Sequence, residues 1–237
     1  MRNYIILNNK NSQEIKGLII QELPSISKPL RKTIIEEIDG KDGDIITDLG
    51  FSAYDKTLQI GLSYNYDIDE VINFFDSKGK VTFSNEMDKY YNYQIVEQID
   101  FERLLRFRTA TVVMHVQPFK YSCIEPKKEY SITTENSIDI KNYGNYISKP
   151  IITITGTGTI NLYLNGVQLF VIELNQNDNV ITIDTNLLEA YNPISKELMN
   201  RSVIGNYDNF GLNVGKNVIS WSGTISKIEL ENYSRWI

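Results

Sequence analysis

FERLLRFRTATVVMHVQPFKY, residues 101–121, is the stretch around which the rest of the chain is organised. From Arg106 to Gln117 the side chains alternate, which predicts a β-strand because successive strand residues point to opposite faces. Both faces are only weakly polar and β-branched residues are frequent, so we expect a central strand that ends at Pro118. One face carries Ala110, Val112, Met114 and Val116, the other Phe107, Thr109, Thr111, Val113 and His115, and three arginines lead in: Arg103, Arg106 and Arg108.

Several short segments, taken in their order along the chain, resemble segments of one protein family. They are FSNEMDKYY (83–91), FERLLRFR (101–108), QPFKY (117–121), NYGNYISKP (142–150), and a closing run from Gly205 through GLNVGKNVISWSG (211–223) to SRWI (234–237). Together they resemble the distal tail proteins of long-tailed, non-contractile bacteriophages. The resemblance implies a structural protein, without catalysis or cofactor, that forms a ring of usually six copies at the tail tip.

The resemblance also implies partners and a location. Such a ring joins the tail tube protein to the adsorption apparatus, which includes the tail-associated lysin or tail fibre hub protein and the receptor-binding protein. We therefore expect a virion component that is assembled in the bacterial cytoplasm. DNA would pass through the ring without specific binding.

Composition agrees with a cytosolic, globular, β-rich protein. The net charge is −6 over 237 residues, which argues against a nucleic-acid-binding surface, because such a surface needs to be basic. A single cysteine, Cys123, rules out an intrachain disulfide. The opening MRNYIILNNKNSQ lacks the features of a signal peptide, and no segment has the roughly 18 apolar residues of a membrane span.

KTIIEEIDGKDGDIITDL, residues 32–49, predicts a β-hairpin with an acidic turn at Asp39–Asp44. It has no thick apolar face of its own, and two strands alone are marginal in water. The resemblance supplies a covering surface, because the hairpin would be an arm laid on the neighbouring subunit. The expected interface residues are Ile34, Ile35, Glu36, Ile38, Ile45 and Ile46.

The acidic turn also allows a calcium-binding interpretation. An EF-hand loop needs a glutamate at its twelfth position, and counting from Asp39 that position is Gly50. The spacing therefore favours a plain turn.

DIDEVINFFDSKG, residues 67–79, predicts the single helix of the chain. Ile68, Val71, Ile72 and Phe75 have the spacing of one apolar stripe, which favours packing on a sheet over a partner-binding face. Asp67 with Glu70 predicts a capping box, and Gly79 a left-handed stop.

Residues 122–137 are polar, which places a domain boundary near residue 130. We expect residues 1–130 to form a mainly β, ring-forming domain with one α-helix and the arm. Short alternating runs in residues 131–237 predict a β-sandwich, and the resemblance implies that it is galectin-like, of jelly-roll type. Asn165-Gly166 predicts a type I′ hairpin within it.

No catalytic or metal-binding constellation is evident. His115 is the only histidine and lies mid-strand, while Cys123 has no motif around it and is expected to be a half-buried, inert thiol. Gly156-Thr157-Gly158 is expected to be a turn between strands, since a phosphate loop needs a third glycine and a following helix. The alternative function is a carbohydrate-binding module, whose exposed aromatics Tyr143, Tyr146 and Tyr191 would stack on host cell-wall sugars.

Overall fold

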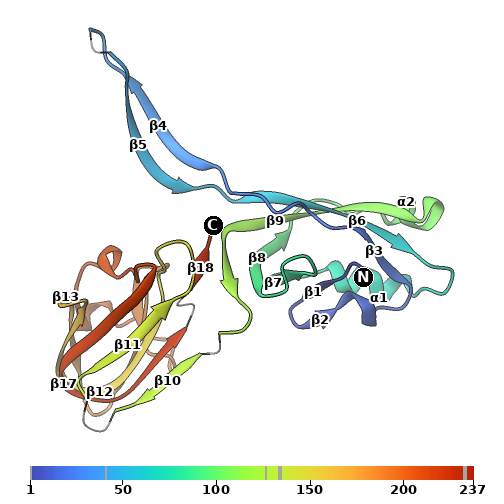
Figure 1. The fold of residues 1–237 in the computed structure, drawn as a ribbon. Coiled ribbons are helices and arrows are strands. Elements are labelled where there is room, and N and C mark those ends of the chain that lie inside the picture. The colour runs from blue at the N-terminus through green and yellow to red at the C-terminus, as the bar shows by residue number, and fades with distance from the viewer. Residues whose placement is uncertain (1, 41, 126, 133–134, 232–233) are drawn as a thin grey trace. The chain divides into compact units, whose positions relative to one another are not determined.

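The computed structural model describes residues 2–40, 42–125, 127–132, 135–231 and 234–237, and it is mainly β with two short α-helices. The chain divides into two compact units (Figure 1), Met1–Cys123 together with Ile237, and Ile124–Trp236. Each unit has a hydrophobic core of its own.

The first unit is built on a curled, half-barrel sheet. Its strands pair in the order β2-β1-β7-β8-β9-β6-β3, and each neighbouring pair in this order is antiparallel. The bounds are β1 Ile5–Leu7, β2 Lys10–Asn11, β3 Leu18–Glu22, β6 Tyr54–Leu62, β7 Lys78–Phe83, β8 Lys89–Ile95 and β9 Thr109–Ser122, with a 3₁₀ turn η1 at Ser12–Glu14.

Strand β9 occupies the central place predicted for it, between β8 and β6. The predicted alternation is confirmed, because Ala110, Val112, Met114 and Val116 are all buried. The predicted end at Pro118 is wrong: β9 continues to Ser122. The register with β8 shifts between Tyr91 and Tyr93, opposite Pro118, so the proline occupies an irregularity where no ladder donor is needed.

The expectation of a single helix is also wrong. FERLLRF forms a second helix, α2 (Phe101–Phe107), whose N-cap Asp100 accepts a hydrogen bond from the backbone N–H of Arg103 at 2.8 Å. The arginines therefore lead into β9 from a helix, and Arg108 ends that helix in the left-handed conformation with φ 59°.

The predicted helix is α1 (Ile68–Phe75), and its cap is confirmed: Asp67 Oδ1 accepts from the N–H groups of Asp69 and Glu70 at 3.1 and 3.2 Å. Glu70 departs from the capping box, because its carboxylate accepts from the N–H of Lys16. Gly79 is not the helix stop, since the helix ends at Asp76 and Gly79 lies in β7. Of the predicted stripe Ile72 is exposed, and Phe74 is buried instead.

The second unit has a sheet region in which two long strands, β12 and β17, pair with each other and with β10, β11, β13 and β14. β12 (Ile151–Leu164) pairs with β14 (Val180–Asp184) through its first half and β13 (Val167–Leu174) through its second. β17 (Gly215–Glu231) lies beside β12 and pairs with β11 (Ser137–Asn142) and then β10 (Lys128–Ser131). The remaining elements are β15 Glu189–Tyr191, β16 Val203–Gly205, β18 Arg235–Trp236, η2 Asn200–Ser202 and η3 Tyr207–Asn209.

The turn at Asn165-Gly166 is confirmed, with φ 50° and 83° between the paired residues Leu164 and Val167. Gly156-Thr157-Gly158 is not a turn, because these residues lie within β12, where the register with β17 is interrupted. Opposite them Gly223 has φ 100°, a conformation that glycine adopts without strain. An added Cβ at Gly223 would lie 2.4 Å from the carbonyl oxygen of Thr159, so the close passage of the two strands also requires glycine.

Candidate functional site

The hairpin predicted from residues 32–49 forms a separate two-stranded sheet of β4 (Arg31–Glu37) and β5 (Asp44–Phe51). We call residues 31–51 the arm; its residue 41 lies outside the described part of the chain. Every described side chain from Arg31 to Leu49 is exposed. The arm is therefore a ribbon that projects from the first unit, as Figure 1 shows.

Both faces of the arm carry isoleucines. On one face Ile35 lies opposite Ile46, and these side chains are 59% and 65% exposed. On the other face Ile34 lies opposite Thr47 and Glu36 opposite Ile45. Ile38, at the end of β4, is exposed as well. All six predicted interface residues are thus on the arm and open to solvent in the single chain.

The tip of the arm is acidic, and an arginine lies at its base. Glu37 and Asp44 lie directly opposite each other, and Asp39 and Asp42 follow in the turn. Like charges placed opposite one another destabilise a strand pair. At the base, Arg31 forms an ion pair with Asp48 and its guanidinium lies 4.8 Å from the centre of the Phe51 ring.

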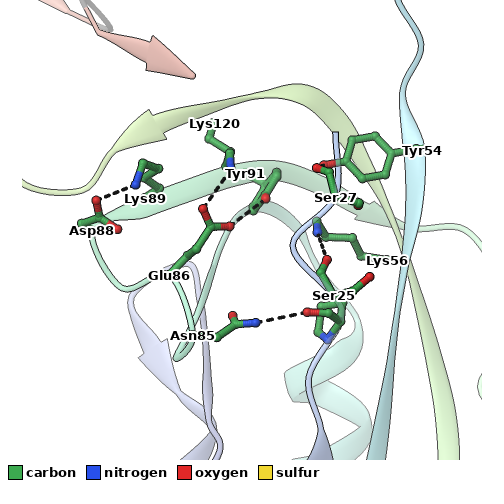
Figure 2. A network of polar contacts seen from close by, with 11 residues as sticks. Ser25, Ser27, Tyr54, Lys56, Asn85, Glu86, Asp88, Lys89, Tyr91 and Lys120 are labelled. Atoms are coloured by element: carbon green, nitrogen blue, oxygen red, sulfur yellow. Dashed lines mark hydrogen bonds and ion pairs between the residues drawn. The ribbon is translucent and has the colours of Figure 1, made fainter. Parts of the chain in front are cut away.

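The chain segment that leads into the arm is held by side chains at its carbonyl oxygens (Figure 2). Asn85 Nδ2 donates to the carbonyl of Pro24 at 3.2 Å, and Lys56 Nζ donates to that of Ser25 at 2.8 Å. The Tyr54 hydroxyl donates to the carbonyl of Ser27 at 3.4 Å. The returning strand is tied to the outgoing one by the Ser52 N–H, which donates to the carbonyl of Leu30 at 2.8 Å.

Lys56 is the centre of this anchor, and it is only 3% exposed. Its ammonium group lies 4.9 Å from the ring centre of Tyr91 and 5.4 Å from that of Tyr54, so aromatic faces supply part of the solvation it has lost. Burial lowers the pKa of Lys56 from 10.5 to about 8, and the nearby carboxylate of Glu86 offsets part of that effect.

Glu86 connects the anchor to the central strand. One carboxylate oxygen of Glu86 lies 2.9 Å from Lys120 Nζ on β9, and the other accepts from the Tyr91 hydroxyl at 3.0 Å. Burial, followed by the nearby hydroxyl of Tyr54 and carboxylate of Glu86, raises the pKa of Tyr91 above its usual range. The charges of Glu86 and Lys120 are thus paired, and the ammonium group of Lys56 is hydrogen-bonded, which makes their burial tolerable.

Sequence reasoning missed this anchor, although strand alternation contains the signal. Lys56 lies in phase with the buried Leu58 and Ile60, and Lys120 lies in phase with Val116. A lysine whose position in a strand directs it toward the core needs polar partners. This requirement identifies Lys56 and Lys120 as members of a buried polar network.

The three tyrosines proposed as sugar contacts belong to two places. Tyr143 and Tyr146 follow β11, where Lys141 and Arg235 lie over their rings at 4.7 and 5.4 Å. Tyr191 lies in β15 and lines a shallow pocket of about 330 Å³ with threonines, Lys127 and Glu231.

The residues considered for catalysis are separated. His115 Nδ1 lies 2.8 Å from Asp55 Oδ1 on the neighbouring strand, and Cys123 is exposed, 3.3 Å from the Thr82 hydroxyl, so the expectation of a half-buried thiol is wrong. Within the described ranges no cluster of His, Cys, Asp and Glu has metal-binding geometry, including the acidic turn of the arm. Of the helices described, none has the length and apolar character to cross a membrane.

Comparison with solved structures places the whole chain on one known fold. It matches the crystal structure of the SPP1 Dit protein, described as a paradigm of the hub adsorption apparatus in phages that infect Gram-positive hosts, with a TM-score of 0.64 and 12% identity over 100% of both chains. It also matches a chain of the phage P2 baseplate in its activated, calcium-containing conformation, with a TM-score of 0.55 and 11% identity over 100% of this chain and 98% of that one. The resemblance seen in the sequence is therefore confirmed at the level of the fold. No protein-family model matches the sequence, and no curated protein matches it significantly.

Proposed function

We propose that this chain is a structural hub protein of a phage tail tip, which forms a ring of six copies between the tail tube and the adsorption apparatus. The full-length fold match to SPP1 Dit supports this role, and so do the sequence segments that resemble distal tail proteins. A hub of this kind performs no catalysis and needs no cofactor.

The observation that carries the proposal is the exposed arm. A two-stranded ribbon is marginally stable unless another surface covers it, and this one exposes isoleucines on both faces. In a closed ring every copy offers the same surface to its neighbour, so each arm is covered and no arm is left over. Ile34, Ile35, Glu36, Ile38, Ile45 and Ile46 are the proposed contact residues.

The anchor at the base of the arm fits this role. Three side chains hold the carbonyl oxygens of Pro24, Ser25 and Ser27, and they come from the sheet and the β7–β8 loop of the same unit. Force on an arm bound to a neighbour would pass through these bonds into the sheet. We therefore propose that residues 1–130 form the ring. Residues 131–237 are proposed to form a galectin-like β-sandwich of jelly-roll type.

The proposed partners follow from the position of such a ring. One face would contact the tail tube protein, and the other the tail-associated lysin or tail fibre hub protein and the receptor-binding protein. The virion tail tip is the proposed location, after assembly in the bacterial cytoplasm. The net charge of −6 suits a ring through which DNA passes without specific binding.

A second candidate function, glycan binding, is favoured only at Tyr191. Its pocket combines an aromatic ring with hydroxyl and carboxylate groups, from residues such as Thr153, Thr182 and Glu231, which are the groups that sugar-binding sites use. A glycan array or a cell-wall pull-down with the wild type and Tyr191→Ala tests this function. Binding that the substitution does not reduce would place any glycan contact elsewhere.

The ring is tested by particle mass and by negative-stain images of the purified protein. Six copies of the 27.3 kDa chain amount to about 164 kDa. Replacing residues 33–48 with a short Gly-Ser linker should leave both units folded and yield monomers. A wild type that stays monomeric at high concentration, alone and with the tail tube protein, rejects the ring; a ring that persists without residues 33–48 rejects the arm as its contact.

A further inference from the structure

Helix α2 presents an exposed surface that combines arginines with apolar side chains. Arg103, Arg106 and Phe107 line a pocket of about 500 Å³ together with Asp100 and Glu102, and Phe107 is 70% exposed. Among the described residues, Arg106 forms one ion pair, with the exposed Glu102 at 3.2 Å, four residues earlier on the same helix. Exposed pairs of this kind contribute little to stability, so Arg106 is free to exchange partners.

The surface continues past the end of the helix. The guanidinium of Arg108 lies 4.9 Å from the ring centre of Tyr66 and 5.9 Å from that of Tyr64, whose side chain is 98% exposed. Within the described residues, Arg108 Nη1 is buried and has no hydrogen-bond partner. We call Tyr64, Arg103, Arg106, Phe107 and Arg108 the α2 patch.

The arm tip is acidic, whereas the α2 patch carries three arginines, which outnumber the neighbouring carboxylates of Asp100 and Glu102. Glu37 and Asp44 face each other across the arm, and Asp39 and Asp42 extend the negative charge into the turn. A cationic partner would attract both carboxylates and relieve the repulsion between Glu37 and Asp44. Ile38, exposed beside them, offers an apolar contact that matches Phe107.

The arm and the α2 patch lie at opposite ends of one strand pair. Strand β6 begins just after the arm, where Tyr54 pairs with Val116 of β9. At the other end Gly61 pairs with Thr109, two residues after α2 (Figure 1). The eight paired positions separate the two ends by about 24 Å. A projection at one end and its complement at the other is the arrangement that joins identical copies head to tail.

We infer that the acidic tip of one copy's arm binds the α2 patch of the next copy. Glu37 and Asp44 would pair with Arg103 and Arg106, while Ile38 covers Phe107. This inference rests on the proposed ring and specifies which surface of the neighbour receives the arm.

Charge reversal on each side, followed by the combination, tests the pairing. One variant carries Arg103→Glu and Arg106→Glu, the second carries Glu37→Lys and Asp44→Lys, and the third carries all four changes. Arg201→Glu with Lys216→Glu is a matched control, because both residues are exposed and lie in the second unit. Circular dichroism and thermal unfolding establish that each variant is folded. Light scattering over a concentration series, at about 0.1 M salt, gives the assembly constant.

Each single-sided reversal should raise the apparent dissociation constant of the ring at least about tenfold, and the combined variant should return it to within about threefold of the wild type. The control should assemble normally. Normal assembly of the Arg103→Glu, Arg106→Glu variant overturns the inference, and so does weakening on both sides without recovery in the combination. In both cases the wild type still forms rings, which distinguishes this failure from failure of the proposed function, where the wild type forms none.

Discussion

Lys56 Nζ lies 2.8 Å from the carbonyl oxygen of Ser25, so a buried lysine of β6 holds the chain just before it enters the arm. The bond joins two parts of the chain that the sequence separates by 31 residues. A buried ammonium group costs free energy that an apolar residue would not, so its presence here indicates a role in positioning rather than in net stability.

Substituting Lys56→Met should therefore loosen the arm base without unfolding the protein. The loss of one hydrogen bond lowers the local opening free energy by about 1 kcal/mol, so amide exchange in residues 25–30 should accelerate about fivefold. Hydrogen exchange followed by mass spectrometry measures this. Lys10→Met, at an exposed position, is the control, and equal exchange in both variants would show that Lys56 does not hold the segment.

The depressed pKa of Lys56 makes a second prediction, for stability against pH. Its pKa is about 8 in the folded protein and 10.5 when exposed, so the unfolded state binds more protons between these values. The contribution of Lys56 is thus fully present above 10.5 and is lost as pH falls through 8. From pH 7 to pH 9.5 it should raise the free energy of unfolding by about 2 kcal/mol.

Lys56→Met removes this group and keeps the other titratable groups of the protein. Burial raises the pKa values of Tyr54 and Tyr91 above 10.0, so both hydroxyls stay protonated in the folded protein over this range. The difference between wild type and variant, from denaturant unfolding at each pH, isolates the lysine. A difference that does not change with pH would mean that Lys56 keeps its ordinary pKa.

The sequence predicted the elements whose pattern is local and long. The alternation of residues 109–116, the Asp67 cap and the Asn165-Gly166 turn are each set by neighbours in the chain, and all three are present. The shape of the arm was predicted for the same reason. The covering of its faces depends on a second molecule, so the isoleucine contacts remain a prediction.

The predictions were wrong where two local patterns compete for the same residues, or where contacts between residues distant in the sequence decide the structure. The predicted strand takes in Arg106 and Phe107, although the Glu, Leu and Arg residues of FERLLRF favour a helix and Asp100 offers a cap. Pro118 was expected to end β9, but an irregularity beside β8 accommodates it. Ile72 was placed in the core, yet the last turn of α1 borders a pocket with Ile95 and Phe101.

The cap of α1 gives a third prediction. Asp67→Ala should lower the free energy of unfolding by about 0.5 to 2 kcal/mol, because the N–H groups of Asp69 and Glu70 lose their acceptor. Denaturant unfolding measures the change. Asp69→Ala, two residues later, should have a smaller effect; a larger effect there would move the functional cap to Asp69.

A fourth prediction concerns the hairpin between β12 and β13. Gly166 has φ 83°, and an added Cβ would meet no atom within 4 Å, so the cost of Gly166→Ala is conformational alone. We expect the free energy of unfolding to fall by about 1 to 2 kcal/mol. Gly166→Asn should cost less, because asparagine tolerates this conformation better than alanine does. Equal costs would indicate that the greater tolerance of asparagine for positive φ has no effect at this position.

The last prediction separates the stability of one copy from the stability of the assembly. Ile35 and Ile46 lie opposite each other and are mostly exposed in the single chain. Ile35→Lys combined with Ile46→Asp places opposite charges across the pair, so it should leave the monomer's thermal unfolding nearly unchanged. In the proposed ring the same two side chains are covered, and burying an isoleucine is worth about 1.5 to 3 kcal/mol. Losing both should raise the apparent dissociation constant by at least about 100-fold, which light scattering across a dilution series would detect. Ile194→Asp, at a site 83% exposed in the second unit, controls for added charge on an exposed isoleucine. If Ile194→Asp weakens assembly as much as the arm variant does, the effect comes from charge alone; if neither weakens it, the Ile35 face of the arm is open to solvent in the assembled ring too.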